Sequence, residues 1–200
     1  METYLKGILL LTLLTLTAFS CDRAEEAFSQ ASGARHVQRW GDLEAVLQVT
    51  DLQGKPKSSF REGENFLLSF TVKNRGKEDA RIVHWDFPFV IQDFLAVYKI
   101  IQEADGKNWV GKPFKSGPSS YDLAPQVVPA ESQLEYVFPW MSETGQRYVM
   151  PIYSKPERNV NKRHYEAVET QPLSKGRYYS GFTLEQEGKE LAFRVKFEVK

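Results

Sequence analysis

Apolar and polar residues alternate with a period of two along most of the chain beyond Gly41. The alternation is clearest over residues 190–199, "ELAFRVKFEV", and it recurs over residues 43–50 and 66–73. A period of two over four to eight residues is typical of strands with one buried face. Turn-forming stretches such as "NRGKED" and "QEGK" separate these runs, and no long amphipathic helical pattern is present. The pattern predicts an all-β, antiparallel β-sandwich of about eight strands.

A short motif before the penultimate run refines this prediction. "LSKGRY", from Leu173 to Tyr178, has the L-x-x-G-x-Y form and resembles the tyrosine corner of immunoglobulin-like domains. The resemblance implies an immunoglobulin-like sandwich. We expect Leu173, Gly176 and Tyr178 to form a structural corner, in which the Tyr178 ring is buried and its hydroxyl bonds to backbone a few residues upstream. Any turn before a strand can also contain a glycine and a tyrosine.

The layout from about residue 43 to 199 resembles the BsuPI-type family of intracellular proteinase inhibitors. The stretches that carry the resemblance are "FLLSFTVKN", "DFLAVYKIIQEADGKNW", "PAESQLEYVFPW" and "LSKGRYYSGFTL". The resemblance implies the same sandwich and, as one alternative, inhibition of a proteinase. The chain departs from the family in its first 20 residues, which are expected to direct export, and in the roughly 35 residues between Trp140 and Gly176.

The N-terminus has the pattern of an export signal. Residues 7–20 are uncharged and largely apolar, with threonines between the leucines, and the run is shorter than the ~20 residues that a membrane-spanning helix needs. "AFSC" then places small residues before Cys21, the only cysteine, and resembles the lipobox of bacterial lipoproteins. We expect residues 1–20 to be a signal peptide and Cys21 to carry a lipid, which also removes an unpaired reactive thiol. Cleavage and plain secretion is the alternative.

Residues 21–41 are expected to be the lipid anchor and a tether, because they are polar and lack sustained periodicity. The immunoglobulin-like domain is then expected over residues 42–200. The lipid on Cys21 would hold the protein on a bacterial membrane, so the expected location is the cell envelope, facing the periplasm or the surface.

The charge balance excludes one class of partner. The chain has 26 Lys and Arg residues and 26 Asp and Glu residues, for a formal net charge of zero. A nucleic-acid-binding protein would show a basic excess, so no nucleic-acid partner is expected. With a single cysteine the chain cannot form an internal disulfide, and packing must supply its stability.

Motifs of catalysis are missing from the sequence. It has no G-x-S-x-G elbow, no H-E-x-x-H, no P-loop and no dinucleotide fingerprint. His84 and Asp86 would point to one face of a strand and could offer two metal ligands, although a half-buried polar pair beside Trp85 is the simpler interpretation. We expect no enzyme activity, no cofactor and no metal.

The tryptophans have two interpretations. Flat rings can stack on sugars in exported sandwich proteins, and large rings are also needed to fill a core without disulfides. Trp85 and Trp140 lie inside predicted strands and are expected in the core, whereas Trp109 lies next to a turn and is the candidate for exposure.

The segment between Trp140 and Gly176 is long for a connection, so we expect it to contain hidden strands or a functional loop. "RYVMPIY" and "HYEAVET" favour strands, with Pro151 confining the first to an edge. Between them, "SKPERNVNKRH" is a basic, aromatic-edged tip on a neutral protein, and a solvated hairpin tip is the alternative. The candidate binding loop consists of Tyr153, Lys155, Arg158, Lys162, Arg163, His164 and Tyr165. Its expected partner is an acidic protein surface or lipid head groups.

Three functions remain open. The first is a non-catalytic protein-binding or assembly module of the cell envelope, anchored to the membrane and bound to a protein partner. The second is a BsuPI-like proteinase inhibitor, and the third is a carbohydrate-binding protein. A broad apolar surface favours the first, a projecting rigid loop the second and an exposed aromatic row the third.

Overall fold

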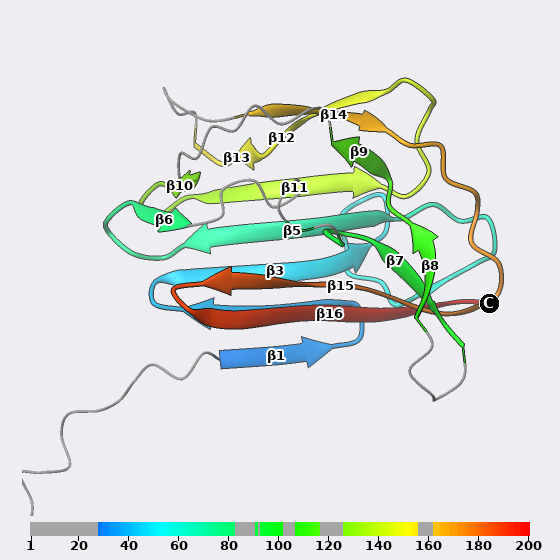
Figure 1. Ribbon diagram of the computed structural model, residues 1–200, viewed down its shortest axis with the longest axis horizontal. Coiled ribbons are helices and arrows are strands. Elements are labelled where there is room, and N and C mark those ends of the chain that lie inside the picture. Colours follow the sequence, from blue (N-terminus) through cyan, green and yellow to red (C-terminus); the bar gives the residue numbers. More distant parts are fainter. Residues whose placement is uncertain (1–27, 83–90, 92, 102–106, 117–125, 156–161) are drawn as a thin grey trace, which may run out of the picture.

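The computed structural model describes residues 28–82, 91, 93–101, 107–116, 126–155 and 162–200, and these residues form strands and turns without a helix (Figure 1). The predicted all-β fold class is therefore confirmed. The predicted signal peptide, residues 1–20, and Cys21 lie outside the described residues. The strands are β1 (Phe28–Ser32), β2 (Arg35–Trp40), β3 (Leu43–Thr50), β4 (Ser59–Phe60), β5 (Leu67–Asn74), β6 (Ala80–Ile82), β7 (Val97–Ile100), β8 (Lys107–Gly111), β9 (Phe114–Ser116), β10 (Gln126–Val128), β11 (Gln133–Pro139), β12 (Arg147–Met150), β13 (Ile152–Tyr153), β14 (Arg163–Ala167), β15 (Gly176–Gln186) and β16 (Lys189–Val199).

Two large sheets form the layers of the sandwich. One has the strand order β1-β2-β3-β5-β11-β13 and the other has the order β4-β16-β15-β7-β8. Their neighbouring strands are antiparallel, except that β4 pairs with β16 in parallel. Two small sheets, β10-β6 and β12-β14-β9, complete the fold. The structure thus divides the chain into more and shorter strands than the alternation alone indicates.

Aromatic side chains from both large sheets meet in the core. The Phe70 ring in β5 lies 5.1 Å from that of Phe182 in β15 and 5.3 Å from that of Phe193 in β16, centroid to centroid. Phe94, which precedes β7, packs on Phe70 at 5.6 Å and on Phe182 at 4.8 Å. The three contacts of Phe70 are edge to face, and such pairs contribute beyond the apolar area that they bury. The core therefore depends on rings that interlock across the two layers.

The long hairpin of β15 and β16 follows the predicted alternation. Its strands pair in register from Gly176↔Val199 to Gln186↔Lys189. The buried residues of β16 are Leu191, Phe193, Val195, Phe197 and Val199. The residues between them are exposed or half-buried, so the predicted division of this strand into a core face and a solvent face is confirmed.

The folded part begins before residue 42, the boundary expected from the sequence. β1 and β2 lie within the segment expected to be a tether, and β2 pairs with β3 over its whole length, from Arg35↔Gln48 to Trp40↔Leu43. The polar residues of β2 explain the difference, because they bond to the backbone of the other sheet. Arg194 N donates to His36 Nδ1 at 2.9 Å, and Gln38 Nε2 donates to the Ala192 carbonyl.

A buried carboxylate lies where β3 meets the turn after β5. Glu44, whose side chain is 7% exposed, accepts from Arg39 Nε at 2.6 Å and from Arg75 Nη2 at 2.7 and 2.8 Å. Burial by itself would raise the pKa of Glu44, but the two guanidinium groups together lower it. The ionised carboxylate is therefore satisfied on both sides, and it links β2, β3 and the end of β5.

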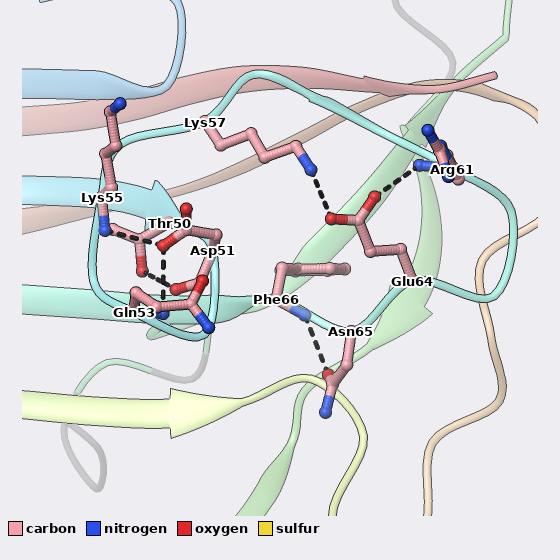
Figure 2. Close-up of polar contacts among 9 residues, drawn as sticks. All are labelled: Thr50, Asp51, Gln53, Lys55, Lys57, Arg61, Glu64, Asn65 and Phe66. Carbon is pink, nitrogen blue, oxygen red and sulfur yellow. Dashed lines mark hydrogen bonds and ion pairs between the residues drawn. The ribbon is translucent and has the colours of Figure 1, made fainter.

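The connection from β3 to β5 is held by side-chain bonds to its own backbone (Figure 2). Asp51 Oδ1 accepts from the N–H groups of Gln53 and Lys55 at 3.0 and 2.9 Å. Glu64 accepts from Arg61 N at 2.9 Å and pairs with Lys57. Such local bonds are the usual way in which a turn satisfies its polar groups. This network fixes a loop, and we assign it a structural role.

The segment between Trp140 and Gly176 contains the strands that its sequence predicts. β12 and β14 pair from Arg147↔Glu166 to Met150↔Arg163, and β14 also pairs with β9. Pro151 separates β12 from β13, and β13 pairs with β11 in the first large sheet. The run "RYVMPIY" thus crosses from a small sheet to a large one.

Candidate functional site

An open groove of about 590 Å³ lies where β7, β8 and β9 meet the segment 168–174. Figure 1 shows β8 and this segment, which leads from β14 to β15, on the same side of the molecule. The segment has no regular secondary structure. The groove walls therefore come from parts of the chain that are far apart in the sequence.

Trp140 forms the floor of the groove. It is 1% exposed, as expected for a core tryptophan, and its indole Nε1 donates to the Gln171 carbonyl at 3.0 Å. Phe66 stacks on it, with ring centroids 5.8 Å apart and planes inclined by 4°. A Cβ placed on Gly111 would lie 3.6 Å from Cη2 of Trp140, so β8 lies next to the outer edge of the indole. The ring thus supports both walls at once.

The predicted tyrosine corner forms one end of the groove. Tyr178 is 1% exposed, and its hydroxyl donates to the Ser174 carbonyl, four residues upstream, at 2.7 Å. Leu173 is buried as well, and Gly176 has a φ of 153°. The burial and the upstream bond are those that the L-x-x-G-x-Y pattern predicts. Because Leu173, Ser174 and Tyr178 all line the groove, this bond fixes the shape of the wall.

Three lysines line the groove, against one glutamate. Lys99 Nζ donates to Ser174 Oγ at 3.0 Å, and Lys115 pairs with Glu166 at 3.0 Å. Lys112 is half-buried, with its Nζ 5.0 Å from the centroid of the Phe114 ring, and among the described residues no carboxylate forms an ion pair with it. Burial lowers the pKa of Lys112, and the charge of Asp93 opposes this effect. The positive charge of Lys112 would stabilise an anion bound beside it.

Exposed apolar side chains border the groove on the β8 side. Trp109 is 52% exposed and Val110 is 39% exposed, and both line the groove. The exposure predicted for Trp109 is therefore confirmed. On its other side the Trp109 ring meets Tyr98 edge to face at 5.6 Å, and Tyr98 stacks on Tyr179 at 4.9 Å. The exposed ring is thus held by buried rings, which suits a contact surface.

The candidate binding loop predicted from the sequence lies apart from this groove, since none of its described residues lines it. Lys155, Lys162 and His164 are exposed and Arg163 is half-buried. Lys155 Nζ donates to the Ala130 carbonyl at 3.0 Å. Arg158 lies outside the described residues. The binding role of these charges stays a prediction.

The two tyrosines of that loop, Tyr153 and Tyr165, are not exposed at its ends. Tyr165 is 1% exposed and packs in the core against Phe114 and Phe138, with ring centroids 5.5 and 5.6 Å apart. Tyr153 is half-buried, and its hydroxyl accepts from Gln126 Nε2. Both tyrosines lie in strands, since β13 pairs with β11 and β14 pairs with β12 and β9. The prediction that they border an exposed binding loop is therefore wrong, and we assign both a structural role.

The candidate metal pair His84 and Asp86, with the neighbouring Trp85, lies outside the described residues. Within the part of the chain that the structure describes, no group of three or more His, Cys, Asp or Glu side chains is placed to hold a metal ion. The same residues contain no helix of the length and apolarity that crossing a lipid bilayer requires.

Comparison with known proteins finds no family model, no curated protein and no solved structure that matches this chain. The groove is therefore the feature from which we infer a function. Sequence reasoning missed its lysines and its second wall, because Lys99, Lys112 and the segment 168–174 meet only through the strand pairing. The one usable signal is "NWVGKPFK", which places an exposed tryptophan next to lysines and a Gly-Lys-Pro turn.

Proposed function

We propose that this protein is an exported lipoprotein, anchored through Cys21, whose β-sandwich binds a protein partner in the groove beside β8 without catalysis. The observation that carries the proposal is the combination of an exposed apolar rim, Trp109 and Val110, with an aromatic floor and lysines in one groove. Binding sites are concave and mostly apolar with a few polar groups, and exposed tryptophan and tyrosine are enriched where proteins meet.

The binding half of the proposal is tested by recovery of partners from native membranes with two matched variants. Trp109→Ala combined with Lys112→Glu changes the groove, and Lys162→Glu combined with Arg163→Glu changes the predicted loop. We expect the groove variant to lose the partner that the unaltered protein recovers and the loop variant to keep it. Equal recovery by the groove variant and the unaltered protein would contradict the groove as the site.

The anchoring half is tested separately by membrane fractionation and mass spectrometry of the native N-terminus. Cys21 should carry a diacylglyceryl group, and Cys21→Ala should release the protein from membranes, because two or more acyl chains at ~0.8 kcal/mol per buried methylene bind almost irreversibly. An unmodified thiol on a soluble protein would refute the anchor and leave the groove proposal intact.

The identity of the recovered partner separates the remaining functions. A proteinase that loses activity when bound would make the module an inhibitor, as the sequence resemblance implies. The exposed Trp109 ring favours carbohydrate as the second candidate, since flat rings stack on sugars. Recovery on polysaccharide resin that depends on Trp109 and not on Lys112 would support that candidate over a protein partner.

A further inference from the structure

Strand β8 is the outermost strand of its sheet. The sheet ends in the order β15-β7-β8, and β8 pairs with β7 from Val97↔Gly111 to Ile100↔Lys107, with a register shift between Val97 and Tyr98 that leaves Val110 without a partner in β7. Among the residues that the structure describes, no strand pairs with the other edge of β8. On such an edge, alternate residues direct their N–H and C=O groups away from the sheet, which makes it a template for another strand.

The same strand forms a wall of the groove. Trp109, Val110 and Gly111 line it, and Asn108, Trp109 and Val110 are exposed. A chain added along β8 would therefore place alternate side chains over Trp140 and Leu173, which are buried and apolar. Strand addition draws affinity from backbone hydrogen bonds and specificity from the pockets that receive alternate side chains.

The charges of the groove favour an acidic segment. Lys99, Lys112 and Lys115 line it together with Glu169; Lys115 pairs with Glu166, whereas Lys112 has no ion-pair partner among the described residues. Lys112 is also half-buried beside Phe114, where water screens a charge less than at the surface. A carboxylate on the added strand would pair with Lys112, whereas a basic segment would be repelled by Lys99 and Lys112.

We propose that β8 takes up an extended acidic segment of the partner protein by strand addition, with a carboxylate on Lys112 and apolar side chains over Trp140. This inference rests on the proposed function and adds the chemical class of the ligand and the way it binds. A second strand at this edge would also cover Trp109 and Val110.

The test uses the full-length protein and a labelled, acetylated octapeptide of alternating Glu and Val. We expect fluorescence anisotropy to show binding that weakens with salt and that falls at least about tenfold for the matched Lys-Val peptide, because like charges across a contact repel. Lys112→Gln should lower the affinity for the Glu-Val peptide by about tenfold, the cost of losing one close charge pair. The loop variant with Lys162→Glu and Arg163→Glu should bind as the unaltered protein does.

Backbone methylation separates strand addition from simple charge attraction. In an extended Glu-Val peptide the amides of Glu point to one side and those of Val to the other. Methylating one of these two sets should abolish binding to β8, and methylating the other should be tolerated. Hydrogen exchange should slow at residues 107–111 when the unmethylated peptide binds. Equal binding of both methylated peptides, equal binding of the Lys-Val peptide, or no binding of the Glu-Val peptide would overturn the inference.

A further arm uses vesicles with anionic lipid head groups. Binding of these vesicles that depends on Lys112, without binding of the Glu-Val peptide, would overturn the inference in favour of a lipid ligand. If the peptides fail but the groove variant still loses its protein partner from membranes, only the strand-addition inference fails. If the groove variant retains that partner, the proposed function fails as well.

Discussion

The tyrosine corner that shapes the groove can be tested by removing the Tyr178 hydroxyl and measuring the free energy of unfolding. Tyr178→Phe removes the 2.7 Å hydrogen bond to the Ser174 carbonyl and a longer one with Ser174 Oγ, and it leaves the ring stacked on Phe197 at 5.6 Å. Ser174 Oγ also lies 3.3 Å from the hydroxyl. One such bond contributes about 1 kcal/mol net, so we expect the free energy of unfolding to fall by about that amount. For a chain of this size the midpoint of thermal unfolding should fall by about 2–4 °C.

The neighbouring tyrosine supplies the matched control. Tyr179 is 7% exposed, and within the described part of the chain its buried hydroxyl has no hydrogen-bond partner. Because an unsatisfied buried hydroxyl is costly, Tyr179→Phe should leave stability unchanged or raise it. Urea unfolding of both variants measures the difference. Equal destabilisation by the two substitutions, or none by Tyr178→Phe, would refute the assignment of the corner bond.

Two further predictions concern buried charge and pH. Glu44→Gln should lower the free energy of unfolding by about 1–3 kcal/mol in urea, because it removes charge-assisted bonds to two arginines; Glu64→Gln, in a more exposed pair, should cost less than about 1 kcal/mol. Burial lowers the pKa of His36, only partly offset by its bond to the Arg194 backbone. The neutral form is therefore favoured in the folded state, and thermal stability should decline as the pH falls below about 6.5, the ordinary histidine value. His36→Asn should reduce this decline, and His164→Asn should not. The same decline in both variants would contradict the assignment of the pH dependence to His36.

The strands that the sequence predicts best are those with one buried face. In β16 the alternation is complete, and its hairpin with β15 forms in the expected place. In β3 the alternation misleads, because Glu44 is expected to face solvent and is only 6% exposed. A carboxylate can be buried when two guanidinium groups satisfy it, and the second of these comes from the turn after β5. Such a long-range partner cannot be recognised from local periodicity.

Strand β2, at the N-terminal side of the domain, is missed by the sequence pattern for a similar reason. The sequence "RHVQRW" contains four polar residues in six, which indicates a solvated tether. It forms β2 because His36 and Gln38 bond to backbone groups of β16, more than 150 residues away in the chain. In the sequence, polar residues that form hydrogen bonds with the backbone of another sheet cannot be distinguished from polar residues that face water.

The candidate site was predictable only in part. The L-x-x-G-x-Y motif correctly places the buried Tyr178 and its bond, and the position of Trp109 beside a turn correctly indicates its exposure. The groove itself depends on where β8 and residues 168–174 meet over Trp140. The basic tip was the more visible feature in the sequence because its charges lie within one short stretch, whereas Lys99 meets Lys112 and Lys115 only through the pairing of β7 with β8.

The central claim, that the groove beside β8 meets a protein partner, is tested most directly by site-specific photocrosslinking in native membranes. A photoreactive benzoyl-phenylalanine replaces Val110, at the groove, or Val127 in β10, which Figure 1 places at the other end of the sandwich. Both positions are exposed, by 39% and 37%. We predict a crosslink to one protein from position 110, its loss on Lys112→Glu, and no such crosslink from position 127. The same crosslinks from both positions, or none from position 110, would contradict the claim.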